Sequence, residues 1–342
     1  MRKPVLSAVM LVYNGEKYLN EAIDSVLGQS FEDFEFIIIN DGSTDRSLNI
    51  INSYTDKRIR LIDNATNLGI PYSRNLGLHE AKGEYLAWCD CDDINLPNRF
   101  KEQVNLLNSN IEIGVCGTWQ IYSKGKRTFV NRTKEQPELV KAILLFMPSI
   151  MNPTSMLRLS MINDNKLNYN ENLAIAEDHD LFLRCSMCFP LTNVQKVLVR
   201  YRASETSIIK KYKFLENESE SIHNVIYAQA LRYLGIEANK TELALHSLIS
   251  SEKGFANFNE YESCFNWLIK IKLINNATKI YDGKMLNMVL AERFYVISKK
   301  ASIYGFVTLK YFLGRSYNNF GYINFDQIWK LSIRCIFKYN KL

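Results

Sequence analysis

Three acidic residues stand within four positions of one another in the segment WCDCDDINLPNRF, residues 88–100. Asp90, Asp92 and Asp93 directly follow the apolar run 85–88, where a buried strand is expected to end. Two like charges a few ångströms apart repel by about 4 kcal/mol at an effective dielectric constant of about 20. The cluster therefore requires a cation, a set of strong hydrogen-bond donors or free exposure to water.

A divalent cation is one answer, because carboxylate oxygens bind Mg²⁺ or Mn²⁺, and such an ion can bridge the anionic oxygens of a nucleotide diphosphate. Asp92 is the candidate ligand. The alternative is that the acids cap the helix that follows, where backbone N–H groups would satisfy them. Pro97 stands near the first turn of that helix, and Phe100, Val104 and Leu107 mark its apolar face.

Strands and helices alternate along the first 110 or so residues in the pattern of a parallel α/β sheet. Apolar runs predict strands at 5–12, 34–40, 58–62 and 85–89, and helical spacing predicts helices at 19–27, 48–54 and 71–82. Ligands of such sheets bind beyond the carboxyl ends of the strands. Asp41 ends the second strand and the acidic cluster ends the fourth, so both stand where a ligand is expected.

The pattern is looser after residue 110. We expect short strands at 114–122 and 127–131, a helix near 137–146, a helix over 177–189 and a strand at 194–201. Beyond about residue 210 the sequence favours helices alone. This predicts an α/β domain over residues 1–210, with a mixed Rossmann-like sheet flanked by helices, and a helical C-terminal region over 211–342.

Composition and charge narrow the class of protein. The chain has 342 residues, 47% of them hydrophobic, which supports a sizeable core. The net charge is +6, but residues 291–342 hold nine basic and two acidic residues (+7), which leaves −1 for residues 1–290. Nucleic-acid binding is disfavoured because the positive charge is confined to the tail. The sequence contains no run of 18 or more apolar residues, so no membrane-spanning helix is predicted.

Cysteine usage bears on location. Seven cysteines at irregular spacing do not suggest a secreted disulfide framework, and no signal peptide opens the chain, so we expect a cytoplasmic protein. Cys185 and Cys188 form a CxxC without a second pair, which favours two small apolar residues on a helix over a zinc or redox site.

Five segments together resemble one enzyme family. They are MLVYNGEKYLNEAIDSVLGQSF (10–31), NDGSTDRS (40–47), NLGIPYSRNLGL (67–78), CDCDDINLPNRFKEQV (89–104) and AEDHDLFLR (176–184). In this order and spacing they resemble the inverting nucleotide-sugar glycosyltransferases of family two, which have the GT-A fold and include enzymes of bacterial cell-surface glycans. The resemblance covers roughly residues 4–207, although Leu11 stands where the family often has proline.

The resemblance implies a donor site. In the family an Asp-x-Asp motif holds ribose hydroxyls and the metal, roles that match Asp90 and Asp92, and Asp93 would support the loop. Asp41 matches the acid that accepts a hydrogen bond from the nucleotide base, and Tyr13 would stack on that base. Glu16 and Arg74 match positions that line the nucleotide pocket. Taken alone, Asp41 fits a turn former and Tyr13 a core residue.

The resemblance also implies a catalytic base. A sugar hydroxyl is a poor nucleophile, so transfer requires a base within hydrogen-bond reach. The Glu177-Asp178 pair resembles the family's Glu-Asp signature: Asp178 matches the base, and Glu177 would bind the acceptor or hold the loop. Asp180 is expected to cap the helix, and His179 to be exposed or packed against a loop. First-turn acids favoured by the helix dipole are the alternative for each acid.

Two further segments resemble the family less specifically. NPTSMLR (152–158) is similar to a segment that borders the acceptor pocket, and RYRASETSI (200–208) to the closing stretch of the family. Ala203 stands where histidine is frequent, whereas Arg202 could still meet the diphosphate.

The C-terminal tail predicts a basic amphipathic helix. Lys330, Arg334, Lys338 and Lys341 fall within about 80° of one another on a helical wheel, with apolar residues around the remainder. Such a helix either lies in the headgroup region of an anionic membrane or packs on the catalytic domain with its lysines outward.

We therefore expect a hexosyltransferase-class enzyme, dependent on Mn²⁺ or Mg²⁺, that transfers a sugar with inversion. The donor would be a nucleotide-sugar, expected to be UDP-linked, and the acceptor a glycan or lipid-linked glycan in surface polysaccharide biosynthesis. The enzyme would work in the cytoplasm, either free or at the inner face of the membrane. The alternatives are a glycoside hydrolase with paired carboxylates and a non-catalytic nucleotide-sugar binding protein.

Overall fold

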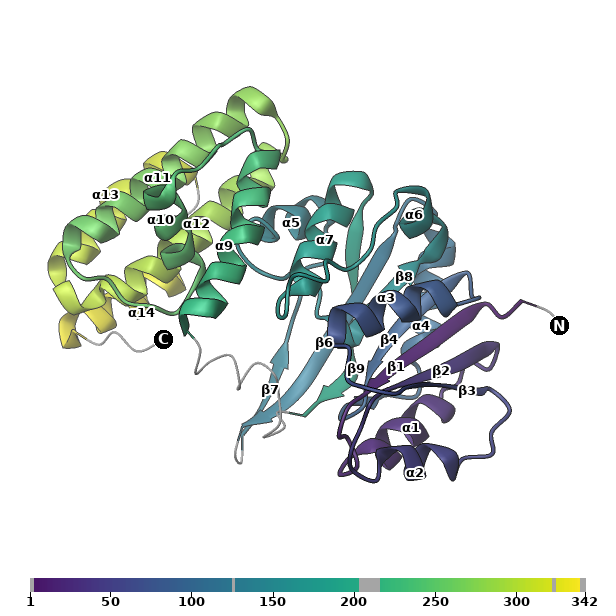
Figure 1. Ribbon diagram of the computed structural model, residues 1–342. Helices are drawn as coiled ribbons and strands as arrows, with labels where there is room; N and C mark the ends of the chain where they lie inside the picture. The colour runs from purple at the N-terminus through teal and green to yellow at the C-terminus, as the bar shows by residue number, and fades with distance from the viewer. Residues whose placement is uncertain (1–2, 125–126, 203–215, 322–323, 339–342) are drawn as a thin grey trace. The chain divides into compact units, whose positions relative to one another are not determined.

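The computed structural model describes residues 3–124, 127–202, 216–321 and 324–338 (Figure 1). The chain divides into two compact units, one made of Met1–Val140 with Pro148–Glu216 and the other of Lys141–Met147 with Asn217–Leu342. The expected boundary near residue 210, the closing stretch from Ala203 onward and Lys341 lie outside the described residues.

One mixed sheet organises the first unit. Nine strands of the described residues belong to it, in the order β3-β2-β1-β4-β8-β6-β9-β5, with β7 paired to β6. Their bounds are β1 (Leu6–Val12), β2 (Phe34–Asp41), β3 (Ile59–Asn64), β4 (Tyr85–Asp90), β5 (Ile94–Asn95), β6 (Val115–Lys124), β7 (Arg127–Asn131), β8 (Met156–Arg158) and β9 (Leu191–Tyr201). The expected mixed sheet is confirmed, and β1 to β4 pair in parallel as the alternating pattern predicted.

Helices cover this sheet, most of them close to the expected positions, although the helices at 152–154 and 159–164 were not predicted (Figure 1). They are α1 (Leu19–Leu27), α2 (Ser47–Asn52), α3 (Ile70–Glu80), α4 (Arg99–Ser109), α5 (Pro137–Ile143), α6 (Leu159–Asp164), α7 (Glu177–Cys188) and the short 3₁₀ helix η1 (Asn152–Thr154). Cys185 and Cys188 lie on α7 with free thiols, the first buried and the second exposed.

Strand β8 was not expected from the sequence. It pairs antiparallel with both β4 and β6, so Met156 stands opposite Ala87 on one side and Cys116 on the other. The segment resembling an acceptor border thus becomes a central strand, and η1 brings Asn152 to the edge of β4.

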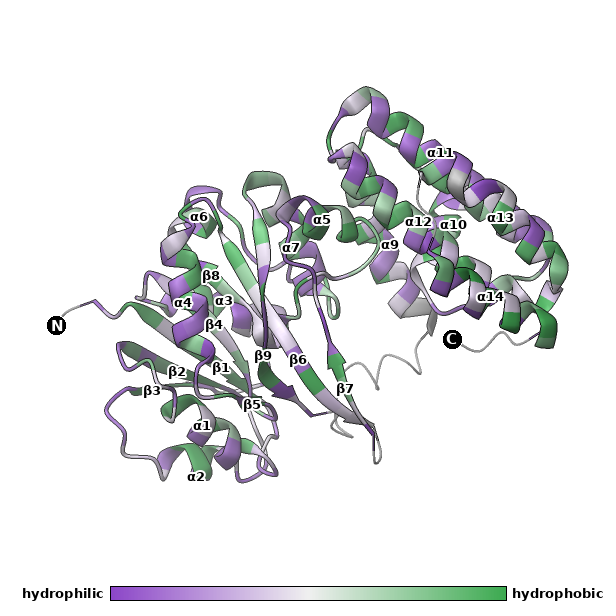
Figure 2. Cartoon of the chain, turned by 180° about the vertical axis from the view of Figure 1, so that it is seen from behind, coloured by the Kyte–Doolittle hydropathy of each residue, from purple (hydrophilic) through white to green (hydrophobic). Residues whose placement is uncertain are grey.

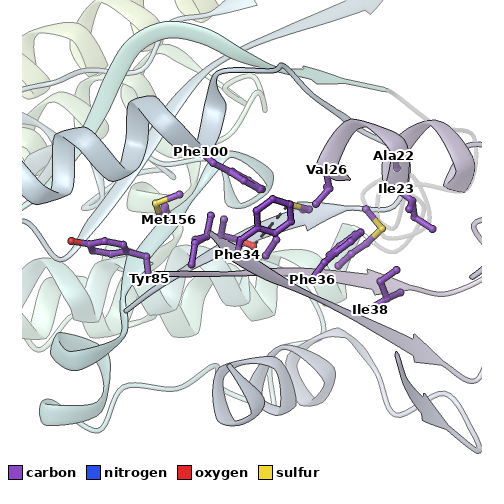
Figure 3. Close-up of a cluster of buried hydrophobic side chains, with 14 of the residues drawn as sticks. Ala22, Ile23, Val26, Phe34, Phe36, Ile38, Tyr85, Phe100 and Met156 are labelled. Atoms are coloured by element: carbon purple, nitrogen blue, oxygen red, sulfur yellow. Dashed lines mark hydrogen bonds between the residues drawn. The ribbon is translucent and has the colours of Figure 1, made fainter. Parts of the chain in front are cut away.

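Apolar side chains from β1, β2 and β4 pack against α1 and α4 (Figure 3). Phe34 and Phe100 meet edge to face, with ring centroids 5.6 Å apart. Full burial of such a side chain contributes about 1.5–3 kcal/mol, so this core holds the strand ends in place.

The second unit is helical, as expected. It holds α9 (Glu216–Tyr233), α10 (Lys240–Ser250), α11 (Phe258–Thr278), α12 (Gly283–Lys300), the 3₁₀ helix η2 (Ala301–Tyr304), α13 (Phe306–Phe320) and α14 (Phe325–Phe337). Among the described residues, no helix combines the length and apolar character needed to cross a bilayer.

Candidate active site

The carboxyl ends of β1, β2 and β4 meet at one edge of the sheet. The parallel register places Val12 opposite Asn40 and Leu11 opposite Asp90. Tyr13, Asp41 and the acidic cluster therefore come from neighbouring strand ends, as parallel pairing requires.

The acidic cluster is compact. Carboxylate oxygens of Asp90, Asp92 and Asp93 lie within 4.8 Å of one another, and Asp93 is buried. Asp93 Oδ1 accepts a hydrogen bond of 2.8 Å from the backbone N–H of Arg202, which is the loop-supporting contact expected of it. Its Oδ2 is buried and has no hydrogen-bond donor among the described residues.

Burial and mutual repulsion disfavour the charged forms of Asp90 and Asp93. Loss of water raises the pKa of Asp90 to about 6; the charge of Arg74 opposes the shift and that of Asp92 adds to it. The pKa of Asp93 rises to about 9, again chiefly through burial and then through Asp90. A divalent cation would favour the ionised forms. An all-oxygen donor set with one unpartnered buried oxygen fits the preferences of Mg²⁺ or Mn²⁺.

The loop after β1 leaves the Tyr13 ring exposed, at 51% of its surface. Asn14 has a left-handed backbone (φ 51°), which asparagine tolerates better than most residues, and its N–H donates to Ser43 Oγ at 3.0 Å. Glu16 accepts hydrogen bonds from the backbone and side chain of Arg46 at 3.0 and 3.2 Å. Glu16 thus ties this loop to the loop after β2.

Asp41 orders the loop that leads into α3. Its Oδ1 accepts from Asn64 Nδ2 at 2.9 Å and from the Leu68 N–H at 3.1 Å, and its Oδ2 accepts from the Gly69 N–H at 3.0 Å. Gly42 follows with φ +67°, and a Cβ there would lie 2.4 Å from the backbone of residue 66. A carboxylate can accept about four hydrogen bonds, so capacity for a ligand remains.

Arg74 lies between two acidic groups. Its guanidinium donates to Glu177 Oε1 in a buried ion pair and lies 5.3 Å from the centroid of the Tyr169 ring. Burial disfavours its charge, but Glu177, Asp90 and Asp178 outweigh this effect and keep the pKa of Arg74 above its ordinary value. The structure thus gives Arg74 a contact that the sequence reasoning did not assign to it.

The start of α7 presents the candidate base. Ala176 precedes the helix in the left-handed region (φ 57°), a conformation that costs a non-glycine residue roughly 1–2 kcal/mol and is typical of functional sites. Asp178 is half-buried, and its Oδ1 accepts from the His179 N–H at 2.8 Å. Burial raises the pKa of Glu177 to about 7, against the attraction of Arg74.

Three expectations about neighbouring side chains were wrong or incomplete. Asp180 does not cap α7; it pairs with Arg184 one turn later at 2.7 Å. His179 is buried, which excludes the exposed alternative and leaves packing inside the protein. The guanidinium of Arg202 pairs with Glu21 and lies 4.7 Å from the centroid of the Tyr18 ring, so it contacts α1.

Sequence reasoning missed three residues beside Arg74. Trp88 and Tyr169 meet edge to face at 5.8 Å, and the Tyr169 hydroxyl donates to Asn152 Oδ1 at 3.2 Å. Trp88 Nε1, Arg74 Nε and Asn152 Nδ2 are buried and have no acceptor among the described residues. Buried donors are rarely left unsatisfied, so this group is typical of a polar-ligand site. Asn152 stands in the segment already singled out, whereas nothing in the sequence marked Tyr169.

Comparisons with known proteins identify the family of the chain. Residues 7–170 match the family described as "Glycosyl transferase family 2". An uncharacterized glycosyltransferase of Haemophilus influenzae is 33% identical over 63% of this chain and 71% of its own length. Another, from Methanocaldococcus jannaschii, is 33% identical over 62% of this chain and 77% of its own.

Two solved structures show the same fold. S. aureus TarS 1-349 in complex with UDP-GlcNAc has a TM-score of 0.59 at 19% identity, covering 96% of this chain and 90% of that one. The mannosyltransferase PcManGT of Pyrobaculum calidifontis, in complex with GDP-Man and Mn²⁺, has a TM-score of 0.50 at 10% identity, covering 99% and 89%.

Fold, strand-end acids and relatives together define a glycosyltransferase with a GT-A-like catalytic unit. The chain belongs to glycosyl transferase family 2.

Proposed function

We propose that this glycosyltransferase is a metal-dependent, inverting enzyme that transfers a sugar from a UDP-linked donor to a glycan or lipid-linked glycan acceptor in surface polysaccharide biosynthesis. One observation carries the proposal: Arg74 pairs with Glu177, at the start of α7, and its guanidinium lies 5.9 Å from the ring centroid of Trp88 on β4, the strand that ends at Asp90. Donor-binding and acceptor-activating acids would therefore share one site.

The donor would lie along the strand ends. Tyr13 has the exposed ring to stack on the base, and Asp41 has acceptor capacity to receive the base's N–H. Asp90 would bind the ribose, and Asp92 would hold Mn²⁺ or Mg²⁺. When bound, such an ion neutralises the diphosphate charge. The complexes of TarS with UDP-GlcNAc and of PcManGT with GDP-Man and Mn²⁺ support a nucleotide-sugar donor and a divalent metal.

Glu16 and Arg74 would position other residues of the donor site, in addition to lining the nucleotide pocket as the sequence predicted. Glu16 fixes the Tyr13 loop through Arg46, and Arg74 fixes Glu177. Both would line the nucleotide pocket and hold its shape.

Asp178 would act as the general base. The acceptor hydroxyl oxygen attacks the anomeric carbon while the bond from that carbon to the diphosphate oxygen breaks, and the hydroxyl proton passes to the Asp178 carboxylate. A single displacement of this kind inverts the anomeric centre. Glu177, held by Arg74, would orient the acceptor.

The C-terminal unit bears on the acceptor and on the place of reaction. Large apolar side chains are exposed on α14 beside basic ones, a combination that suits contact with the inner face of the cytoplasmic membrane. A lipid-linked acceptor would be reached from such a surface.

A thermal-shift screen of UDP- and GDP-linked sugars, with and without Mn²⁺, tests the proposal. A ligand of the folded state raises the apparent melting temperature. We expect one UDP-sugar to do so only with the metal, and to be turned over when acceptor is added. Release of free sugar without any nucleotide would indicate a hydrolase instead. Stabilisation without turnover on any glycan acceptor would indicate a binding protein.

A further inference from the structure

Helix α14 exposes a stripe of large apolar side chains. They are Phe325 (83% exposed), Trp329 (68%), Ile333 (39%), Ile336 (56%) and Phe337 (76%). Spacings of four and three residues place them on one side of the helix, whereas Leu331 and Cys335 are buried against the rest of the unit. A helix that spent all its apolar residues on internal packing would not show this stripe. Figure 2 shows green, hydrophobic residues alternating with purple, hydrophilic ones along α14.

A second element extends this apolar surface. Ile303, Phe306 and Val307, at the junction of η2 and α13, are 46%, 68% and 59% exposed. Gly305, within this junction, adjoins the end of α14: a Cβ on it would lie 3.5 Å from the Cys335 carbonyl oxygen and 3.6 Å from Lys338 Cε. The exposed side chains of the η2–α13 junction and those of α14 therefore lie on either side of the contact between Gly305 and the end of α14. We call these two sets of side chains together the α13–α14 face.

A basic cavity opens beside the same helix. Its volume is about 620 Å³, and Lys299, Lys330 and Arg334 line it together with Tyr295, Asn324, Asp326, Gln327 and Ile333. Lys330 pairs with Asp326 at 2.6 Å. With three basic residues and one acid, the lining of the cavity carries a net charge of +2. Burial, and then the charge of Arg334, lower the pKa of Lys299, which shows that the positive charges repel one another here.

We propose that the α13–α14 face docks on an anionic lipid bilayer and that the basic cavity takes the phosphate of one lipid headgroup. Charge complementarity requires an anion in the cavity, and the adjacent apolar stripe requires hydrocarbon rather than water or a soluble polyanion. Membrane contact is part of the proposed function; the headgroup site deepens it by naming the ligand class and the residues. It needs no residue of the catalytic unit.

Vesicle binding tests the inference with the full-length protein. Trp329 is exposed, whereas Trp88 and Trp267 are buried and Trp119 is half-buried, so a blue shift of tryptophan fluorescence that is lost in Trp329→Ser reports insertion of α14. We expect binding to phosphatidylcholine vesicles that contain phosphatidylglycerol and little binding to phosphatidylcholine alone. The triple variant Lys299→Gln, Lys330→Gln, Arg334→Gln should weaken binding about 100-fold, at about 5-fold for each basic side chain near the surface.

A matched variant controls for net charge. Lys240, Lys279 and Lys284 are exposed, and Lys284 lies at the other end of α12 from Lys299. Changing these three to Gln removes the same charge and should leave binding within about 2-fold, because charges beyond a Debye length of about 8 Å contribute little. The double variant Trp329→Ser, Phe337→Ser should also weaken binding. Because both side chains are exposed, we expect this variant to fold even if the basic triple variant does not.

Three results would overturn the inference. Equal weakening by both lysine variants would leave no role for the cavity. Equal binding to neutral and anionic vesicles would remove the headgroup phosphate as ligand. Stabilisation by inorganic phosphate or polyphosphate without any vesicle binding would assign the cavity to a soluble anion. Donor binding, measured by thermal shift with UDP-sugars and Mn²⁺, involves other residues and separates these outcomes from failure of the proposed function.

Discussion

The catalytic unit has two groups of acidic residues, Glu177-Asp178 and Asp90-Asp92-Asp93. Positive charge compensates them in different ways. Glu177, at the start of α7, contacts the Arg74 guanidinium directly. At the end of β4, by contrast, three carboxylates lie within 4.8 Å of one another, and the ion pairs of the described residues do not include Asp90 or Asp93. Arg74 lowers the pKa of Asp90 from a distance but does not prevent its net rise.

If the proposed metal binds at the end of β4, this difference separates a permanent structural cation from an exchangeable one. A charge that must always be present is best supplied by an arginine, which does not lose its proton in proteins. A cation that arrives with a diphosphate must find carboxylates still available. The two groups should therefore respond in opposite ways when a charge is removed, and the following variants test this.

The largest effect is expected at the base. Asp178→Asn keeps the shape of the side chain but cannot accept the acceptor proton, so transfer should fall about 10²–10⁴-fold. Nucleotide affinity, measured by calorimetry, should stay nearly unchanged. Glu171→Gln is the control, because it removes an exposed carboxylate from the segment before α7. Full activity of purified Asp178→Asn would remove this residue from the role of base.

Asp92→Asn should reduce transfer about 10²–10³-fold, because the developing diphosphate charge loses its metal-dependent stabilisation. Wild-type activity after chelation provides the comparison: it should fall to the level of the variant, and the variant itself should not respond to chelator or added Mn²⁺. A variant that still shows saturable Mn²⁺ activation would place the metal on other residues.

The strand-end position of the acids could be predicted from the sequence because it depends on local signals. Apolar runs and helical spacing located β1 to β4, and parallel pairing then brings Asp41 and Asp90 to one edge. The Arg74–Glu177 contact joins residues 103 positions apart. No periodicity encodes that distance, so the sequence placed Arg74 in the pocket without its partner.

Strand β8 and helix α14 show two further limits. A strand of three residues is too short to display alternation, and its place depends on Tyr85 and Val115, which are remote in sequence. The helical wheel correctly placed Lys330 and Arg334 on one face of α14, but the helix ends at Phe337, before Lys338, and the wheel did not show which apolar residues are buried. That depends on the neighbouring η2 and α13, which leave Trp329 and Phe337 exposed.

Removing the resident cation should destabilise the fold. Arg74→Met leaves Glu177 buried without its partner, a change that costs about 3 kcal/mol in comparable pairs. The loss should grow with pH. The pKa of Glu177 is already raised to about 7 in the folded protein and rises further without Arg74. An acid with a raised folded pKa loses stability as pH increases above its unfolded value. Urea unfolding at about pH 5 and about pH 8 measures the difference.

Arg60→Met is the matched control for that experiment. Arg60 also pairs with carboxylates, with Glu80 at 2.7 Å and with Glu35 at 3.9 Å, but its own side chain and that of Glu80 are about one-third exposed. A surface pair contributes about 0–1 kcal/mol, so this variant should lose little stability at either pH. Equal losses in the two variants would contradict the distinction between a buried and a solvated partner.

The smallest effect has the opposite sign. Asp92→Asn should stabilise the metal-free protein, by about 1 kcal/mol, because the Asp92 charge raises the pKa of both Asp90 and Asp93 and its removal relieves that repulsion. Thermal unfolding with chelator present measures this gain. On addition of Mn²⁺ the order should reverse, since only the wild type retains the full carboxylate set and gains stability by binding. A metal-free variant less stable than the wild type would mean that the cluster is held by the protein's own donors, and the contrast with Glu177 would then disappear.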